Sequence, residues 1–288
     1  MITPHAEAFF DPLTSTYSYV VHAEGNPQCA IIDPVLDYEP HSATTSTRSA
    51  QQLIDYIKKN QLELQWIIET HAHADHLSAG SWIKSQLGGQ LAIGTPITQV
   101  QHTFKNIYHL NDQVKTNGEP FDRLFAAEEQ FHIGDMVVDV LHVPGHTPAD
   151  MAYHVHGLGI FVGDTIFLPD VGSARCDFPG GNAEQLYDSV HRLLAFPEDT
   201  VLFMCHDYPP SSREAQYHCT VADQRKNNIH LRDGISKAEF VAMRTQRDAT
   251  LGLPKLMLPA LQVNIQAGQL PTAEEDGHRY LKIPLNRF

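Results

Sequence analysis

Short apolar runs bounded by turn-forming residues recur along the chain, and this pattern predicts buried strands. Several of these runs end in a histidine or an aspartate, which favours one shared edge of a sheet system where loops build a site. The predicted strands lie within residues 17–21, 29–32, 66–70, 90–94, 129–143, 150–157, 158–167 and 200–208, with a turn at 24–27 joining the first two.

Apolar residues at helical spacing alternate with the predicted strands. In residues 49–60, for example, Leu53, Ile54 and Ile57 fall on one helical face. The predicted helices cover residues 49–60, 77–87, 96–104, 183–194 and 237–248, with Pro96 opening the third and Asn182 capping the fourth.

Length and composition are consistent with one large domain and a small addition. The chain has 288 residues, and its hydrophobic content of 42% is enough for a packed core. We expect a catalytic domain over residues 1–235. Residues 236–288 hold a helix and the Pro- and Leu-rich stretch 253–264, and they are expected to form a helical and extended appendage packed on that domain.

Charge and cysteine usage exclude several classes of partner. The chain carries 20 basic and 34 acidic residues, a formal charge of −14, and no dense Lys/Arg block, so nucleic acid and anionic membrane surfaces are not expected partners. No apolar run is long enough to span a bilayer. The 4 cysteines are scattered without a C-x-x-C pair, which is typical of reduced thiols and predicts a cytoplasmic protein.

The stretch THAHADH, residues 70–76, directly follows an apolar run and is dense in possible metal ligands. In extended geometry His71, His73 and Asp75 project to the same side, and His76 is expected to open the next helix. Imidazole and carboxylate together suit zinc, iron or manganese. The sequence therefore predicts a metal site after this strand.

Further candidate ligands follow other predicted strands. These are His146 in VPGHTP, Asp164 in VGDT and His206 in MCHDY. With them, two metals shared between the strand ends are chemically reasonable.

The motifs THAHADH, PGHTP, GDT and HDY, in this order, resemble those of the metallo-β-lactamase superfamily. The resemblance covers about residues 14–230. It implies an α/β fold, the four-layer αβ/βα sandwich in which two mixed β-sheets pack face to face with helices outside. It also implies a metal site at one edge of the sheets.

One stretch discriminates among branches of that superfamily. GSARCDFPGG, residues 172–181, is similar to the G-x-x-R-x-D-F element of the persulfide (sulfur) dioxygenases, here Gly172, Arg175, Asp177 and Phe178. Glyoxalase II has a lysine where Arg175 stands and lacks the Asp-Phe pair. The segment 165–171 and the C-terminal tail are longer than in the mitochondrial-type dioxygenases and resemble a bacterial subgroup, so substrate contacts transfer less directly.

This branch implies one Fe(II) per chain, held by His71, His146 and Asp164. Two histidines and one carboxylate on one face of iron leave room for O₂ and a substrate. The implied reaction oxidises glutathione persulfide with O₂ to sulfite and glutathione. An unfilled second metal site, which lines and supports the first, would then comprise His73, Asp75, His76 and His206.

Other side chains are expected near the substrate. Arg175 suits the carboxylates of glutathione, although a structural ion pair with Asp177 is an equal alternative. Tyr208 is expected to hydrogen-bond near the metal, and Asp207 to orient a ligand histidine. A homodimer is a family-level expectation. His154 and His156 are expected to be ordinary surface or core histidines.

Two alternatives stay open. A glyoxalase II-like thioesterase would hold two zinc ions or a mixed Fe/Zn pair, with His73, Asp75, His76 and His206 as additional ligands and a bridging hydroxide as nucleophile. A non-catalytic metal-binding sulfur sensor is the alternative from another class. The complete ligand set argues against the sensor, because a pure binder needs no open coordination positions.

Overall fold

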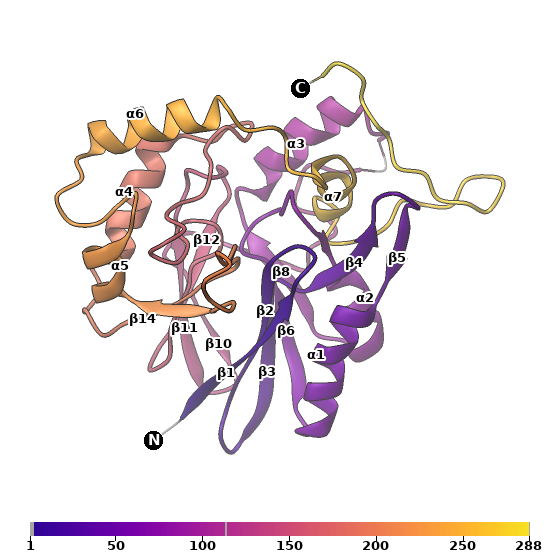
Figure 1. Cartoon of the computed structure of the whole chain (residues 1–288). Coiled ribbons are helices and arrows are strands. Elements are labelled where there is room, and N and C mark those ends of the chain that lie inside the picture. Colours follow the sequence, from indigo (N-terminus) through magenta and orange to yellow (C-terminus); the bar gives the residue numbers. More distant parts are fainter. Residues whose placement is uncertain (1–2, 113, 288) are drawn as a thin grey trace.

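Two mixed six-stranded sheets pack face to face in the computed structural model, which describes residues 3–112 and 114–287 (Figure 1). The first sheet has the order β1-β2-β3-β6-β8-β9, and the second runs β10-β11-β12-β13-β14-β15. The first sheet consists of β1 (Pro4–Asp11), β2 (Thr16–Ala23), β3 (Asn26–Ile32), β6 (Glu63–Ile68), β8 (Gln90–Gly94) and β9 (Arg123–Phe125). The second consists of β10 (Gln130–Ile133), β11 (Met136–His142), β12 (Met151–Val155), β13 (Gly159–Phe161), β14 (Val201–Phe203) and β15 (His218–Thr220). A small third sheet joins β5 (Thr44–Ser46), β4 (Val35–Glu39) and β7 (Leu77–Ser78).

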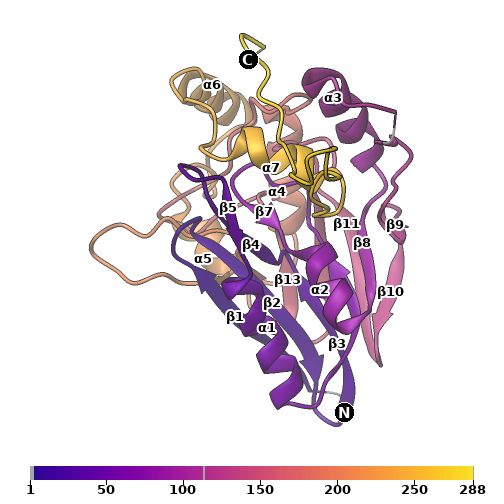
Figure 2. The same ribbon diagram turned by 90° about the vertical axis from the view of Figure 1, so that its right-hand side faces the viewer.

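Helices cover the outer face of each sheet. Figures 1 and 2 show the two groups on opposite sides of the paired sheets. The first sheet carries α1 (Arg48–Lys59), α2 (Gly80–Leu87), α3 (Ile97–Tyr108) and α7 (Met257–Asn264), and the second carries α4 (Ala183–Leu193), α5 (Val221–Asn227) and α6 (Lys237–Asp248).

The continuous apolar run of β3 follows from this layering. Cys29 and Ile31 face the core beneath the outer helices, whereas Ala30 and Ile32 face the core between the sheets. Successive side chains of a strand point to opposite faces, so a strand buried on both faces has no polar positions. The predicted four-layer sandwich is confirmed.

Most predicted helices are confirmed at their starts. Pro96 is the N-cap of α3, and the side chain of Asn182 accepts a hydrogen bond from the Gln185 amide at 3.0 Å to cap α4. The helix predicted to begin after His76 is wrong at its first turn. Leu77 and Ser78 form β7 against β4, and α2 begins only at Gly80. Residues 69–76 are therefore a loop, and the extended geometry predicted for them is not found.

Strand β1 was not predicted, because its residues alternate weakly and most are only partly buried. It pairs antiparallel with β2 along its whole length. Within residues 3–112 and 114–287, every helix is too short or too polar to cross a bilayer.

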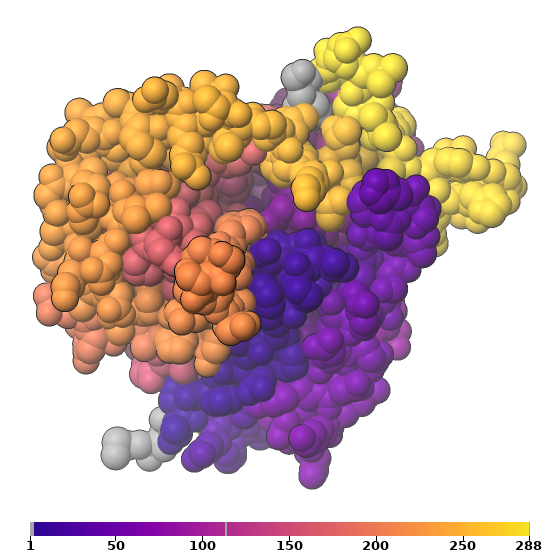
Figure 3. All heavy atoms as spheres, in the orientation of Figure 1, coloured from indigo at the N-terminus to yellow at the C-terminus, as the bar shows by residue number. Residues whose placement is uncertain are grey.

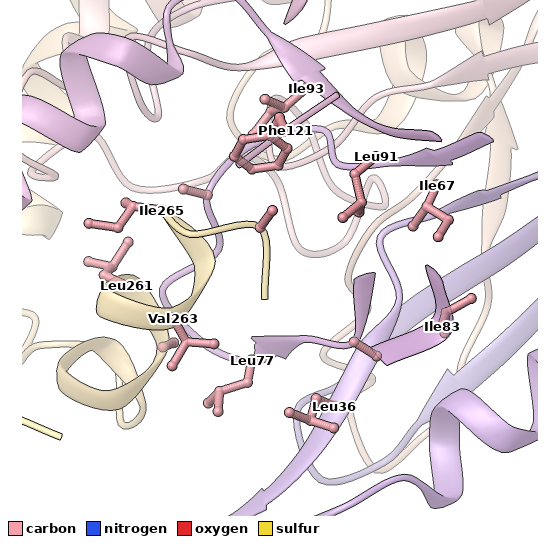
Figure 4. Close-up of a cluster of buried hydrophobic side chains, with 14 of the residues drawn as sticks. Leu36, Ile67, Leu77, Ile83, Leu91, Ile93, Phe121, Leu261, Val263 and Ile265 are labelled. Carbon is pink, nitrogen blue, oxygen red and sulfur yellow. The ribbon is translucent and has the colours of Figure 1, made fainter. Parts of the chain in front are cut away.

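The C-terminal segment packs on both halves of the sandwich. Phe240 of α6 is part of the core beneath the second sheet. Helix α7 is apolar around most of its surface and is embedded in the core beneath the first sheet, where Figure 4 shows Val263 toward Leu77. Beyond Gly268 most of the chain is exposed, and Figure 3 shows this last stretch, in yellow, standing out from the surface.

Candidate metal centre

The predicted ligands meet at one edge of the sandwich, in the loops that follow β6, β11, β13 and β14. The ligand atoms of His71, His146 and Asp164 lie within 4.8 Å of one another. A second group satisfies the same limit and contains His73, Asp75, His76 and His206.

Asp164 faces both groups. Its Oδ2 lies 3.9 Å from His71 Nε2 and 3.8 Å from His146 Nε2. Its Oδ1 lies 3.4 Å from His206 Nε2, which is itself 3.2 Å from a carboxylate oxygen of Asp75. The Asp164 carboxylate is therefore placed to contact either of two neighbouring cations.

The donor atoms fit a metal because they are buried without other partners. No hydrogen-bond partner within residues 3–112 and 114–287 reaches the following buried atoms: His71 Nε2, His73 Nδ1, His76 Nε2, Asp164 Oδ1 and His206 Nε2. Buried polar atoms in proteins are nearly always paired, so this convergent set calls for a cation. Nitrogen and carboxylate donors match zinc, iron or manganese.

Electrostatics favour the metal-binding forms of the histidines. Burial, followed by repulsion from neighbouring imidazoles, lowers the pKa values of His71 and His73 well below the ordinary histidine value. Burial also lowers the pKa of His76. The three rings are thus neutral at neutral pH, as ligation requires.

The carboxylates respond to their surroundings in opposite directions. Burial raises the pKa of Asp75, but the facing imidazoles of His206 and His76 outweigh it, and the net shift is downward. Burial raises the pKa of Asp164 well above the ordinary value, and the charge of Asp75 adds to this. A cation between the two groups would offset that cost, because opposite charge favours the ionised carboxylate.

Each ligand histidine has one ring nitrogen directed at the centre, and its other ring nitrogen forms a hydrogen bond with a neighbouring group. The pairs are His71 Nδ1 with Thr70 Oγ1 (3.1 Å), His73 Nε2 with Asp33 (3.0 Å), His76 Nδ1 with the Leu77 carbonyl (3.1 Å), His146 Nδ1 with the Arg175 carbonyl (2.7 Å) and His206 Nδ1 with Thr16 Oγ1 (3.2 Å). Such contacts fix ring orientation and keep the opposite nitrogen aimed at a metal.

Asp33 is a site residue that the sequence reasoning missed. It is buried and also accepts hydrogen bonds from the Thr70 amide at 2.7 Å and the Thr70 hydroxyl at 2.9 Å. It follows the apolar run of β3, so the signal was the one used for the other ligands, an aspartate at a strand end.

Asn264 is a second missed residue and comes from the last helix. Its Nδ2 donates to the carbonyls of His73 and His76, both at 2.8 Å, and its Oδ1 accepts from the Ser78 amide at 2.8 Å. The 69–76 loop, hereafter the metal loop, is therefore braced by α7. Nothing local in the sequence signals a contact across that separation.

Arg175 and Asp177 lie beside the ligands and bind each other. The Arg175 guanidinium donates to both oxygens of Asp177 at 2.5 Å, and its Nη1 donates to the Gly252 carbonyl at 2.7 Å. The ion pair considered as an alternative thus exists, while the substrate role of Arg175 stays a prediction. Phe178 is buried, and its ring centroid lies 6.1 Å from that of His146.

The neighbouring residues Asp207 and Tyr208, which follow β14, have side chains with different partners. The Tyr208 hydroxyl lies 3.5 Å from Asp75 Oδ2, and its ring stacks parallel to His206 at 5.8 Å. Asp207 is fully buried and binds Arg213 at 2.6 and 2.8 Å. Within residues 3–112 and 114–287 no hydrogen bond joins this carboxylate to a ligand histidine, and Asp207 instead holds Arg213 and the Gln216 amide.

Comparison with known proteins places this centre in a family. A sequence profile described as the metallo-beta-lactamase superfamily matches residues 11–206. The chain therefore belongs to the metallo-β-lactamase superfamily, and it carries the ligand set described above.

Some proteins similar to this chain are named as a hydrolase or a glyoxylase, and others are named as a persulfide dioxygenase or ETHE1. The chain is 48% identical over 289 residues to a probable metallo-hydrolase of Burkholderia pseudomallei, covering 97% of this chain and 98% of the relative. It is also 48% identical over 281 residues to a Dictyostelium discoideum protein named glyoxylase B2, covering 97% and 96%. To human mitochondrial persulfide dioxygenase ETHE1 it is 27% identical over 267 residues, covering 92% and 89%. The crystal structure of ETHE1 from Myxococcus xanthus superposes with a TM-score of 0.74 at 26% identity, covering 92% of this chain and all of that one.

Proposed function

We propose that this protein is a glutathione-dependent persulfide dioxygenase with one Fe(II) held by His71, His146 and Asp164. The observation that carries the proposal is the contact between the 172–181 loop and the ligands. The Arg175 carbonyl accepts a hydrogen bond from His146 Nδ1 at 2.7 Å, so the dioxygenase-like element orients a ligand directly. Similarity to the proteins named ETHE1 supports the same reaction class.

The reaction balances without a further oxidant. One glutathione persulfide, one O₂ and one water give one glutathione, one sulfite and two protons. Iron, when bound, would supply coordination positions for O₂ and for the terminal sulfur, and the redox chemistry between them.

Side chains of the protein would set the protonation and orientation of the ligands, limit access of water and bind the substrate. His71 is kept neutral by burial, and the Thr70 hydroxyl holds its other ring nitrogen. Phe178 packs beside His146 and limits water on that side of the ligand. We further propose that Arg175 binds a carboxylate of glutathione through N–H groups not directed at Asp177, since a guanidinium carries five of them.

A dinuclear thioesterase is the second candidate, and one observation favours it. Asp164 faces both ligand groups, and the second group is complete and buried apart from the partly exposed Asp75. The relatives named metallo-hydrolase and glyoxylase B2 are consistent with that chemistry. Two metals with a bridging hydroxide would hydrolyse the thioester of S-lactoylglutathione.

Oxygen uptake and metal analysis separate these candidates. Protein purified without added metal is expected to carry about one iron per chain, and iron-loaded protein to consume O₂ and release sulfite in equal amounts when given glutathione persulfide. Hydrolysis of S-lactoylglutathione without oxygen uptake would contradict the proposal and favour the thioesterase. Absence of both activities in metal-loaded protein would favour the sensor.

A further inference from the structure

Another cluster of side chains of the types that bind metals lies on the outer face of the second sheet. It consists of Asp139 on β11, His154 on β12 and His156 immediately beyond β12. Asp139 and His154 are opposite each other in the antiparallel register. His154 and His156 are two residues apart, so both rings project to the same face as the carboxylate.

The distances within this cluster suit one cation. Asp139 Oδ2 lies 2.6 Å from His156 Nε2 and 3.4 Å from His154 Nδ1. All three ligand atoms lie within 4.8 Å of one another. In a tetrahedral site with metal–ligand bonds of about 2.0–2.1 Å, ligand atoms are roughly 3.3 Å apart, a value that the two measured distances bracket.

The surroundings hold the ligands in place. Gln130 Nε2 donates to Asp139 Oδ1 at 2.8 Å, which leaves Oδ2 directed at the histidines. The Phe196 ring stands edge-on to His154 at 5.0 Å and forms an apolar wall. Outer contacts of this kind orient ligands and strengthen metal binding.

Protonation states agree with this geometry. Burial, and then the neighbouring His156, lowers the pKa of His154, so the imidazole is neutral at neutral pH. Burial raises the pKa of Asp139, but hydrogen bonds from Gln130 and His156 outweigh it and the net shift is downward. The side chains of His154, His156 and Asp139 are 22%, 47% and 33% exposed, so solvent reaches the cluster.

We propose that Asp139, His154 and His156 bind one divalent transition-metal ion of the Zn²⁺ type, separate from the catalytic centre. Imidazole and carboxylate ligands match that class of metal, and a water completes the coordination. Because the ligands come from two adjacent strands and the turn after them, the ion cross-links this end of the second sheet. The site is independent of the reaction that the main centre catalyses.

Zinc titration of the iron-loaded protein tests this site. Calorimetry with ZnCl₂ at pH 7.5 should show one more Zn²⁺ bound per chain in the wild type than in His156→Ala, because any zinc taken up by the second ligand group of the main centre is common to both proteins. The iron content should stay constant. His154→Ala, His156→Ala and Asp139→Asn should each weaken this binding at least about 10-fold. His132→Ala is the matched control, since His132 is an exposed histidine on the neighbouring strand β10, and it should bind as the wild type does.

A second readout guards against misfolded variants. Binding to the folded state raises Tm, so Zn²⁺ should raise Tm of the wild type and of His132→Ala by more than that of His156→Ala. His156 is the most exposed of the three ligands, so its replacement should leave the fold intact. No Zn²⁺ uptake by the wild type, or equal uptake by wild type and His156→Ala, would overturn the proposal and leave a hydrogen-bonded cluster.

Discussion

Two loops at the metal centre, the metal loop and the 172–181 loop, contribute to it in different ways. The metal loop follows β6 directly, and its ligands are close in sequence. The 172–181 loop contributes no ligand but contacts one through the Arg175 carbonyl. Ligand identity is thus encoded locally, whereas ligand orientation depends on a segment far away in the chain.

The two loops are alike in one respect, because both are supported by residues far away in the sequence. Asp33 and Asn264 brace the metal loop from opposite ends of the sequence. The 172–181 loop is tied to the C-terminal region, where Arg244 donates to the Ser173 carbonyl at 3.2 Å and Asp248 accepts from the Cys176 amide at 2.8 Å. Both loops therefore depend on residues beyond the matched family segment, 11–206.

The largest effect is expected within the metal loop itself. His71→Ala should strip the iron and abolish turnover, because His71 is one of three proposed ligands. His76→Ala should retain most of the iron and lose activity only in part, since His76 belongs to the second ligand group. Metal analysis and oxygen uptake of the two variants check this difference.

The same pair of variants distinguishes one metal from two. In a dinuclear hydrolase His76 holds one of the ions, so its removal would lower the metal content. Wild-type protein with two ions per chain and His76→Ala with one would contradict the dioxygenase assignment.

Replacing Asn264 should have the next largest effect. Asn264→Asp removes the donors to the His73 and His76 carbonyls and places a buried charge against them. We expect iron affinity, measured by chelator competition, to fall about 10-fold, because His71, the proposed iron ligand in the metal loop, would shift with the backbone that Asn264 holds.

Gln262→Ala is the control for a general loss of packing. Gln262 is a buried amide on the same helix, but it bonds to the Leu258 and Lys282 carbonyls and not to the metal loop. Both variants should lower Tm, and only the Asn264 variant should weaken iron binding. Equal iron affinity in the two variants would show that Asn264 does not position the ligands.

The contrast between the loops also explains what could be predicted from the sequence. The candidate ligands and the cap at Asn182 follow from local patterns, because strand ends, motif spacing and capping residues act over a few positions. The four-layer sandwich was instead predicted from the resemblance of the motifs to a known superfamily. Asn264 and the partner of Asp207 could not be predicted, since their contacts depend on where distant segments meet. The prediction that a helix begins directly after His76 was wrong for the same reason. Strand β7 pairs with β4, and this tertiary contact overrides the helical spacing of the sequence.

A smaller effect is expected in the 172–181 loop. Arg175→Ala should leave the iron content unchanged and raise KM for glutathione persulfide roughly 10-fold, because a hydrogen bond to a charged group is worth about 1.5–3 kcal/mol. Asp177→Asn removes the ion pair but keeps the arginine, so it serves as the matched variant. An unchanged KM in Arg175→Ala, with Tm lowered as much as in Asp177→Asn, would show that the pair is structural only.

The effect that leaves the reaction at neutral pH unchanged concerns His230, which supports the 172–181 loop. His230 is buried and its Nδ1 accepts from the Ser173 amide at 3.0 Å, while burial, followed by Arg244, lowers its pKa from 6.5 to about 4. Between these values the unfolded chain binds a proton that the folded protein does not, so stability is lost as pH falls from about 6.5 to about 4. His230→Asn keeps an acceptor for Ser173 and does not titrate. The free energy of unfolding of the wild type, from urea titrations, should therefore fall more steeply in this window than that of the variant, by up to about 1.4 kcal/mol per pH unit. If the free energy of unfolding instead changed with pH equally in the two proteins, the pKa of His230 would be the same in the folded protein and the unfolded chain, and the prediction would be wrong.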